Sequence, residues 1–306
     1  MYNITIPQNS SSNCYDTIFY SLLKYYNFEY EAYNIEYFYT DYYDNMYSNI
    51  CRGKFHVNSL KDIYNIDLIF THRNESCDLY KIVRNSLDTK PIGIIIDPYH
   101  CYWSPFFQQA HFFHMVLIVG IDYCNKQYIC FDVHYGSTGY MKVDFDVINN
   151  NFMKYFIIDF KEVNRIQPEL IINKINASVN NFDYNIDSKK VNLLNYFRTS
   201  DRETLFPNGI KTSIMLINIM WIAEDKKNSR ILFKYIEDKI NKNVFSYINE
   251  LLSISEQKFI LLKTTLIKYA ITGVLNYENL KNIIDKIYDI DLLIINQMKN
   301  VLGDIL

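Results

Sequence analysis

The chain has 306 residues, of which 49% are hydrophobic and 21% charged, a composition typical of a folded globular protein and not of a disordered or collagen-like one. Its net charge of -3, from 31 basic and 34 acidic residues, provides no broad positive surface of the kind that binds nucleic acid through its phosphates. We therefore expect no nucleic-acid partner.

No apolar run in the sequence approaches the roughly 20 residues needed to cross a bilayer. The first residues, MYNITIPQNSSSNC, carry neither a basic leader nor an apolar stretch, so we expect a cytoplasmic protein without a membrane partner. The six cysteines, at positions 14, 51, 77, 101, 124 and 130, form no CxxC pair. We expect most of them to be reduced, buried, small hydrophobic residues.

The first expected element is an amphipathic helix in the segment CYDTIFYSLLKYYN. Apolar residues recur in it at the spacing of one helix face, at Ile18, Phe19, Leu22, Leu23 and Tyr26. A polar residue just before the segment, Ser12 or Asn13, is suited to cap the helix. This pattern places Cys14 at the start of the helix.

A group of short β-rich runs follows the helix. Each run is β-branched or aromatic and is bounded by Asn, Asp, Gly or Pro; the runs lie at 91–97, 114–122, 126–133, 139–145 and 153–160. They predict an antiparallel sheet of about five strands. One helix followed by such a sheet indicates an α+β domain.

The remainder of the chain is dominated by helical patterns with little Gly or Pro, in which apolar residues recur at three and four. We therefore predict two domains, an α+β domain at residues 1–162 and an all-helical domain at residues 163–306. We expect most of these apolar helix faces to pack together in a hydrophobic core. Alternatively, they could form a surface that binds a partner, or the interface of a homo-oligomer.

Cys14 is the candidate nucleophile. Unpaired backbone N–H groups and the positive end of the helix dipole stabilise a thiolate at a helix start, where a thiol pKa can fall from about 8.5 to between roughly 3.5 and 7.5. Many cysteines at helix starts are structural, so this position alone does not identify a reactive thiol. For Cys14 to act as a nucleophile, a base that can accept the thiol proton must lie near it.

That base is predicted by two strands joined by a tight turn around Cys124 to Lys126. Chain reversal there brings His114, at the start of one strand, close to Asp132, at the end of the next. A carboxylate beside an imidazole fixes its tautomer and stabilises its cationic form, while the other ring nitrogen can take a proton from a thiol. Cys14, His114 and Asp132 together would make an activated nucleophile.

Other residues in the same region compete for these roles. His111 lies three residues before His114 and is the alternative base, and Asp97 and Asp122 are alternatives to Asp132 as the orienting carboxylate. We favour His114 because it directly adjoins the strand. The HxxH pair could also be interpreted as a metal site, but it lacks the fixed facing that the pair has on a helix, and we expect no metal.

Gln8 completes the candidate catalytic set. It precedes Cys14 by six residues, and its side-chain amide could join the Cys14 backbone N–H in polarising a carbonyl oxygen. An oxyanion hole of this type contributes a few kcal/mol to the transition state. A single Gln at this spacing arises easily by chance, so its value lies in the combination with the other three residues.

Aromatic residues suggest where a substrate would bind. Trp103, with Tyr99 and Tyr102, lies in the loop that leads into the histidine strand, and loops commonly carry specificity. The tyrosine-rich stretch 25–47 could line an acyl-chain channel or a phenolic pocket. Codon-biased core and surface packing is the simpler interpretation of that stretch.

The pattern Gln-x5-Cys at a helix start, followed about a hundred residues later by His-Met-Val-Leu-Ile-Val-Gly-Ile-Asp and then Phe-Asp at 131 and 132, resembles the papain-like cysteine fold in its bacterial C39-like branch. More narrowly, the segment from Asp97 to Phe106, DPYHCYWSPF, leading into His114, looks like the butirosin biosynthesis protein H type of N-terminal domain from specialised-metabolite gene clusters. The resemblance covers the motifs of residues 8 to about 135, and the helical remainder only by architecture.

This resemblance implies acyl transfer through a cysteine thioester. The closest analogy is with papain-like enzymes of thiotemplated pathways, including the polythioamide type, which form an amide from an acyl group on a carrier protein and an amine. The partners implied are an acyl or peptidyl carrier protein and a small amine, with no bound cofactor beyond the phosphopantetheine arm of the carrier.

Three functions follow as alternatives. The chain departs from the peptidases by lacking a Gly-rich stretch around Cys14 and by having Val133 after Asp132, which favours an amide-forming acyltransferase over a papain-like peptidase or hydrolase. A non-catalytic protein that binds a small molecule in an aromatic cavity is the third interpretation. That last function would be unaffected by Cys14→Ala.

Overall fold

The computed structural model of this chain describes residues 2–6, 14–35, 57–74, 77–109, 111–133, 139–161, 166–180, 186–207, 209–210 and 213–306. Contacts between Cα atoms divide the chain into two compact units, Met1–Tyr30 with Gly53–Arg165, and Glu31–Arg52 with Ile166–Leu306. The domain boundaries 1–162 and 163–306 stay a prediction.

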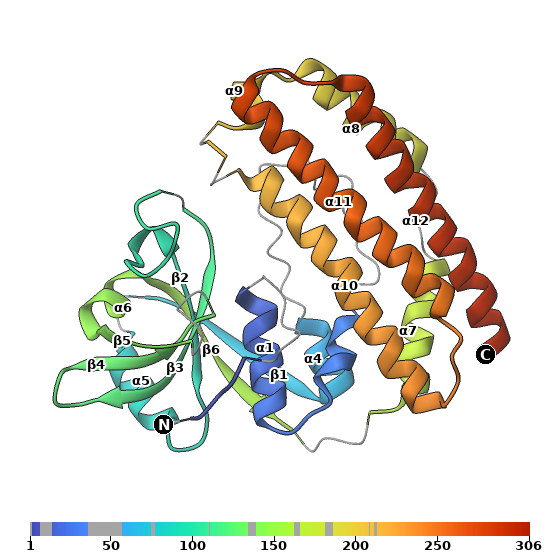
Figure 1. Cartoon of the computed structure of the whole chain (residues 1–306). Coiled ribbons are helices and arrows are strands. Elements are labelled where there is room, and N and C mark those ends of the chain that lie inside the picture. The colour runs from blue at the N-terminus through green and yellow to red at the C-terminus, as the bar shows by residue number, and fades with distance from the viewer. Residues whose placement is uncertain are drawn as a thin grey trace. The chain divides into compact units, whose positions relative to one another are not determined.

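The first unit is built on a six-stranded antiparallel sheet with strand order β1-β6-β2-β3-β4-β5 (Figure 1). Its strands are β1 (Ile66–His72), β2 (Ile92–Ile96), β3 (His114–Asp122), β4 (Gln127–Phe131), β5 (Tyr140–Asp144) and β6 (Phe152–Phe160). The α+β class and the antiparallel sheet predicted from the sequence are confirmed. β2 and most of β3 are buried because they occupy the centre of this sheet.

All five predicted strands are present, and the sheet has one more, β1, which the sequence pattern did not indicate. β1 pairs along its whole length with β6 and forms the edge of the sheet. Most of its residues are only partly buried, and polar Asp67 and Thr71 interrupt its apolar character. An edge strand of this kind lacks the continuous β-branched run that identifies a central strand.

The helix α1 (Cys14–Tyr25) packs on one face of the sheet, where Phe19 lies 6.2 Å from Phe156 between ring centroids. The ring of Phe156 lies directly over Gly93 of β2: a Cβ at Gly93 would be 1.8 Å from the Phe156 Cζ. Glycine is therefore required at this point of the central strand, because only the absence of a side chain lets the aromatic ring pack against the backbone.

The opposite face of the sheet is covered by two short helices, α5 (Leu79–Ser86) and α6 (Phe145–Asn151). Leu79 and Val83 of α5 and Ile148 of α6 join a core with the inward-facing residues of β2, β3 and β4. The other short helices described in this unit are α4 (Val57–Tyr64) and η2 (Pro98–His100), whereas η1 (Tyr30–Asn34) begins at Tyr30 and continues into the residues of the second unit. These short helices were not predicted, because elements of a few residues show too little periodicity.

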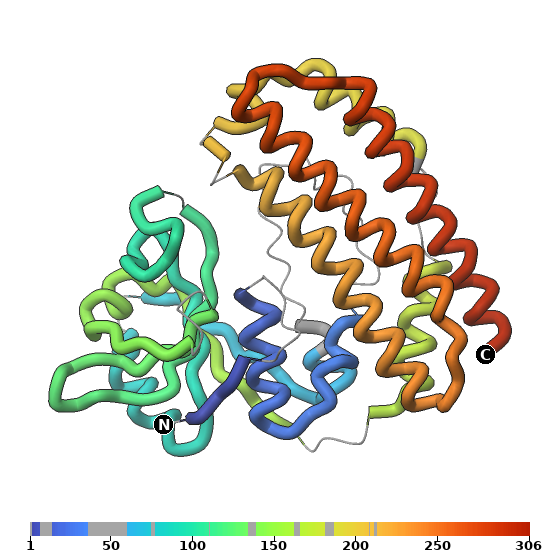
Figure 2. The backbone as a smooth tube through the Cα atoms, viewed as in Figure 1, coloured from blue at the N-terminus to red at the C-terminus, as the bar shows by residue number. Residues whose placement is uncertain are grey.

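The second unit contains three long helices that lie side by side (Figure 2). From Ile166 onward, the helices that the structure describes are α7 (Pro168–Asn180), α8 (Ile186–Thr199), α9 (Arg202–Leu205), α10 (Ile214–Ile240), α11 (Ser246–Thr272) and α12 (Tyr277–Ile305). Local chemistry sets their ends. The Ser213 hydroxyl caps the N-terminus of α10, and α11 ends at Gly273 in the left-handed conformation.

Apolar residues of α8, α10, α11 and α12 form the core of this helical unit. A charged pair is buried beside it: the Lys226 ammonium lies 2.9 Å from the Asp291 carboxylate, which also accepts a hydrogen bond of 3.0 Å from the Ser255 hydroxyl. These three residues come from α10, α12 and α11, so the cluster links all three long helices.

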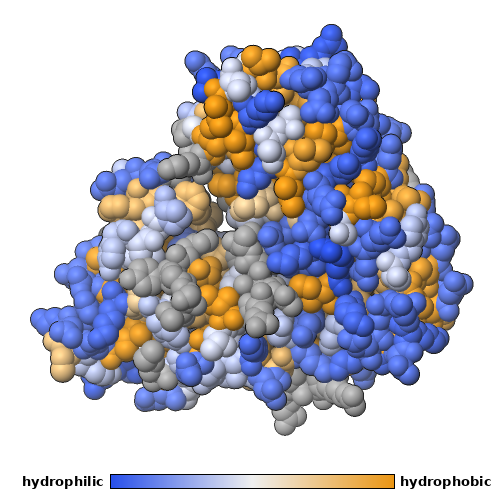
Figure 3. All heavy atoms as spheres, viewed as in Figure 1, coloured by the Kyte–Doolittle hydropathy of each residue, from blue (hydrophilic) through white to orange (hydrophobic). Residues whose placement is uncertain are grey.

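Apolar side chains also lie at the surface, in patches among hydrophilic ones on the face shown in Figure 3. At α11 and just beyond its end, the exposed aliphatic side chains are those of Ile260, Leu261, Ile271 and Val274. Within the described ranges, no helix has the length and apolar character to cross a membrane.

Candidate functional site

The candidate site lies at one end of the sheet in the first unit. Cys14 is the first residue of α1, at the helix start where the sequence placed it, and its side chain is buried. His114 is the first residue of β3 and pairs with Ile96, the last residue of β2. Asp132 directly follows β4, and its backbone N–H donates to the Gly139 carbonyl over 2.7 Å.

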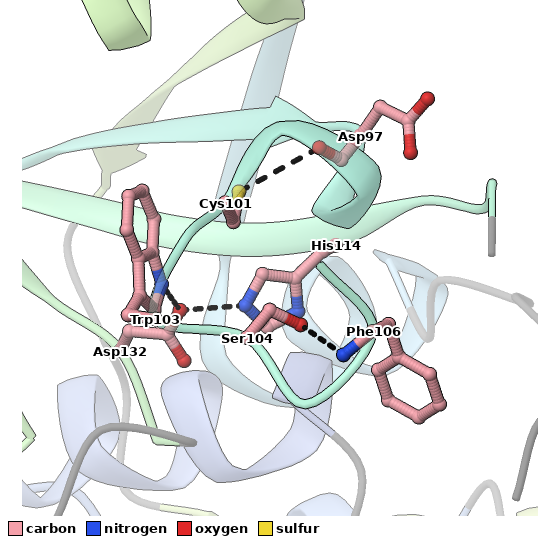
Figure 4. A network of polar contacts seen from close by, with 7 residues as sticks. All are labelled: Asp97, Cys101, Trp103, Ser104, Phe106, His114 and Asp132. Atoms are coloured by element: carbon pink, nitrogen blue, oxygen red, sulfur yellow. Dashed lines mark hydrogen bonds and ion pairs between the residues drawn. The ribbon is translucent and has the colours of Figure 1, made fainter. Parts of the chain in front are cut away.

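The hairpin of β3 and β4 brings the predicted histidine and aspartate together. The distance from His114 Nε2 to Asp132 Oδ2 is 2.6 Å (Figure 4). The two strands pair in a register that changes between Ile118 and Gly120, and this bulge makes the chain reversal slightly asymmetric. Despite this change of register, the side chains of His114 and Asp132 are still in contact, because both residues lie at the open end of the hairpin.

Cys14 acts on the same imidazole, because a side-chain hydrogen bond with Cys14 is among the interactions that raise the pKa of His114. Since Nε2 is engaged by Asp132, Nδ1 is the ring nitrogen left to face the sulfur. His114 therefore lies between a thiol and a carboxylate. The structure brings together three of the four residues in the predicted catalytic set, and Gln8 lies outside the described residues, as do Ser12 and Asn13.

The surroundings of His114 favour its protonated form. The imidazole is 1% exposed and the Asp132 carboxylate 0%. Burial alone would lower the pKa of His114, but the charges and hydrogen bonds of Asp132 and Cys14 outweigh it and raise the pKa to about 10. An imidazolium held in this way stabilises negative charge on both of its neighbours, which is the electrostatic condition for a nucleophilic thiolate.

Trp103 contacts the Asp132 carboxylate, which the sequence did not suggest. Its indole N–H donates to Asp132 Oδ2 over 2.8 Å, the oxygen that also faces His114 (Figure 4). Cys101 and Ser104, its neighbours in the loop, are buried. The sequence placed Trp103 close to the histidine strand, but a hydrogen bond between residues 103 and 132 depends on the path of the loop, which no periodicity encodes.

The alternative base and carboxylates, His111, Asp97 and Asp122, make contacts of their own. His111 pairs with Asp97 over 2.6 Å, stacks on Tyr99 at 4.1 Å between ring centroids, and has a side chain that is 66% exposed. Asp122 has a pKa lowered to about 2 by its hydrogen bonds to Lys142 and Asn125. His111 thus has its own carboxylate, distinct from the one that contacts His114.

The predicted substrate-binding tyrosines lie in the same loop as Trp103, between β2 and β3. Tyr102 is 56% exposed, packs edge-on against Trp103, and donates to the Lys142 carbonyl over 3.3 Å. Tyr99 is engaged with His111. In the tyrosine-rich stretch 25–47, only residues 25–35 are described; there Tyr26 packs on Phe160, while positions 36–47 lie outside the described residues.

The remaining cysteines are all unpaired where the structure describes them. Cys101 and Cys130 are buried, Cys77 is partly buried and Cys124 is exposed, while Cys51 lies outside the described residues. Burial raises the thiol pKa of Cys101 and Cys130, and the nearby Asp132 charge raises it further. In the described part of the chain, no three His, Cys, Asp or Glu residues cluster in a way that could hold a metal ion.

No protein-family model matches this chain, and no curated protein matches it at a significant level. The function of this chain must therefore be inferred from the geometry of Cys14, His114 and Asp132 and from the chemistry that this geometry permits.

Proposed function

We propose that this chain is a papain-like, cysteine-dependent acyltransferase that forms an amide bond from a carrier-bound thioester and an amine. The observation that carries the proposal is the buried imidazole of His114, which contacts Cys14 on one side and Asp132 on the other. A sulfur, an imidazole and a carboxylate in this order are the components of an activated nucleophile.

The proposed reaction begins when the Cys14 thiolate attacks the carbonyl carbon of an acyl thioester on the pantetheine arm of a carrier protein. The Cys14 backbone N–H and Gln8 would stabilise the oxyanion. Collapse of the tetrahedral intermediate breaks the carbon–sulfur bond to pantetheine, whose sulfur leaves with the proton held by His114. The acyl group is then linked to Cys14 as a new thioester.

In the second half-reaction, the nitrogen of an amine attacks the Cys14 thioester. Neutral His114 accepts the proton from the nitrogen, and the intermediate collapses to release an amide and return the Cys14 thiolate beside the His114 imidazolium. Asp132 orients the imidazole through both steps. Water in place of the amine would make the same residues a hydrolase, so aminolysis requires a bound amine and the exclusion of water.

Intact-mass analysis tests this proposal directly. Purified protein is incubated with a carrier protein loaded with an acyl-phosphopantetheine thioester, and we expect an acyl adduct on the wild type that is absent from Cys14→Ala. The matched control is Cys124→Ala, which removes an exposed cysteine outside the site and should keep the adduct. An adduct that persists in Cys14→Ala would contradict the proposal.

The alternative functions predict different results. A peptidase would cleave peptides and leave carrier-bound acyl groups untouched. A non-catalytic binding protein would give no adduct, and its ligand affinity would be unchanged in Cys14→Ala. We further propose a cytoplasmic location, since carrier-bound acyl thioesters of thiotemplated pathways are made there and a catalytic thiol must remain reduced.

A further inference from the structure

One carboxylate oxygen of Asp132 receives two side-chain contacts. Oδ2 lies 2.6 Å from His114 Nε2 and 2.8 Å from Trp103 Nε1 (Figure 4). An indole N–H can only donate a hydrogen bond, so Oδ2 must act as an acceptor toward it. Trp103 therefore favours the carboxylate whose Oδ2 is free of a proton.

Stabilisation of the carboxylate matters because Asp132 is fully buried. A buried carboxylate is unfavourable unless hydrogen bonds and a partner charge compensate for lost hydration. Besides His114 from β3, the titratable groups acting on Asp132 include Cys101, which lies between β2 and β3, and Cys130 from β4. Both are thiols with raised pKa values, so they contribute no positive charge.

The loop that carries Trp103 is itself held in place. We call residues 97–113, which connect β2 and β3, the β2–β3 loop; residue 110 lies outside the described residues. The backbone N–H of Gln108 donates to the Tyr99 carbonyl over 3.1 Å, and that of Ser104 donates to the Cys101 carbonyl over 2.8 Å. Tyr102, adjacent to Trp103, donates to the carbonyl of Lys142 on β5.

We propose that Trp103 is a positioning residue that fixes the Asp132 carboxylate against His114 and keeps it ionised. This inference rests on the proposed chemistry of Cys14, His114 and Asp132, and it differs from the role in substrate binding that the sequence suggested for Trp103. The tryptophan acts through Asp132. The hydrogen-bonded loop places its indole N–H within hydrogen-bonding distance of the Asp132 Oδ2 that also faces His114.

Proton NMR tests the contact without any substrate. The chain has two tryptophans, Trp103 and Trp221, so its spectrum contains two indole N–H signals, and Trp221→Phe assigns them. We expect the Trp103 signal to lie downfield and to move upfield in Asp132→Asn, because a neutral amide oxygen is a weaker acceptor. The Trp221 signal should stay in place. A Trp103 signal that is unaffected by Asp132→Asn would overturn the inference.

The pH dependence of Cys14 alkylation tests the role. Iodoacetamide is added to the wild type, Trp103→Phe and Trp221→Phe over a pH series, and the Cys14 peptide is quantified by mass spectrometry. In Trp103→Phe we expect a rate roughly tenfold or more below wild type at neutral pH, the size of a lost hydrogen bond to a charged group. The acid limb should move to higher pH, because Asp132 loses a donor that favours its ionised form.

The outcomes separate this inference from the proposed function. If Cys14 of the wild type alkylates with the pH dependence of an ordinary thiol, the proposed function fails, while the indole signal still decides whether Trp103 bonds Asp132. If Cys14 is equally reactive in the wild type and in Trp103→Phe, with the same acid limb, the positioning role alone fails. If Trp103→Phe does not fold, the NMR comparison of the wild type with Asp132→Asn decides.

Discussion

At the scale of single residues, the central feature is an imidazole that is kept charged inside the protein. A group whose pKa is raised on folding stabilises the folded state fully below its unfolded pKa, and this contribution disappears as the pH rises through the folded pKa. For His114 the window runs from the ordinary value of 6.5 to about 10. The stabilisation belongs to the protonated imidazole and to the groups on either side of it.

The first prediction concerns this window. The stability difference between the wild type and His114→Gln should be on the order of a few kcal/mol at pH 6 and should shrink as the pH rises from about 7 to 10. Urea unfolding at a series of pH values measures it. A difference that grows across that range would mean that burial, which favours the neutral ring, controls His114.

The second prediction separates the two histidines. His111→Gln changes an exposed ring that pairs with Asp97, whereas His114→Gln removes the ring that contacts Cys14. We expect His111→Gln to keep the Cys14 alkylation rate within about twofold of wild type, and His114→Gln to lower it about a hundredfold near neutral pH, the usual size of a lost acid–base group. Equal losses in both variants would return His111 to consideration as the base.

The sequence permits part of this site to be predicted. The tight turn between two strong strands places His114 near Asp132, since a hairpin brings the residues at its open end together whatever the details of register. Cys14 could be chosen as the candidate nucleophile because it lies at the start of a helix. The contact of Trp103 with Asp132 could not be predicted, because it depends on how an irregular loop folds back over the strands.

At the scale of elements, strands could be predicted where their own sequence pattern specifies them, and not where pairing with another strand does. β2 is an apolar run, β3 is apolar between His114 and Asp122, and this composition identifies both as central strands of the sheet. β1 is half-exposed, so its strand character comes from pairing with β6 and is absent from its own pattern. Short helices such as α5 are specified by single contacts, including the Asp78 cap, more than by periodicity.

The third prediction concerns the centre of the sheet. Gly93→Ala would place a methyl group 1.8 Å from Phe156 Cζ, so β2 and β6 must move apart or the ring must leave its place on the α1 face. We expect a loss of about 3 kcal/mol, at the upper end of overpacking effects. The matched control is Gly303→Ala in α12, where an added Cβ meets no atom within 4 Å.

Thermal and urea unfolding measure both glycine variants. Gly303→Ala should be neutral or stabilising by up to about 1 kcal/mol, because alanine has the higher helix propensity. Comparable destabilisation by the two substitutions would show that loss of glycine in itself, and not the close approach of Phe156, is responsible.

At the scale of the whole molecule, the chain combines two units that each hold a buried charged pair beside an apolar core. In the first unit the pair is His114 and Asp132 at the end of the sheet, and in the helical unit it is Lys226 and Asp291. Lys226 and Asp291 are 9% and 5% exposed. A buried pair adds little net stability, but removing one partner leaves an uncompensated charge.

The fourth prediction uses this pair to test whether the two units are stabilised independently. Lys226→Met leaves the Asp291 carboxylate without its ammonium partner, and we expect a loss of about 3 to 5 kcal/mol, much of it recovered in Lys226→Met with Asp291→Leu. Because the affected contacts lie among α10, α11 and α12, native-state hydrogen exchange should accelerate at amides of these helices and stay unchanged in β2 and β3.

The control Lys234→Met removes an exposed ion pair with Asp238 on the same helix and should change the exchange rates of neither set of amides. Equal acceleration of sheet and helix amides in Lys226→Met would show that the chain opens as one cooperative body, and then Gly93→Ala would also have to weaken the protection of the helices.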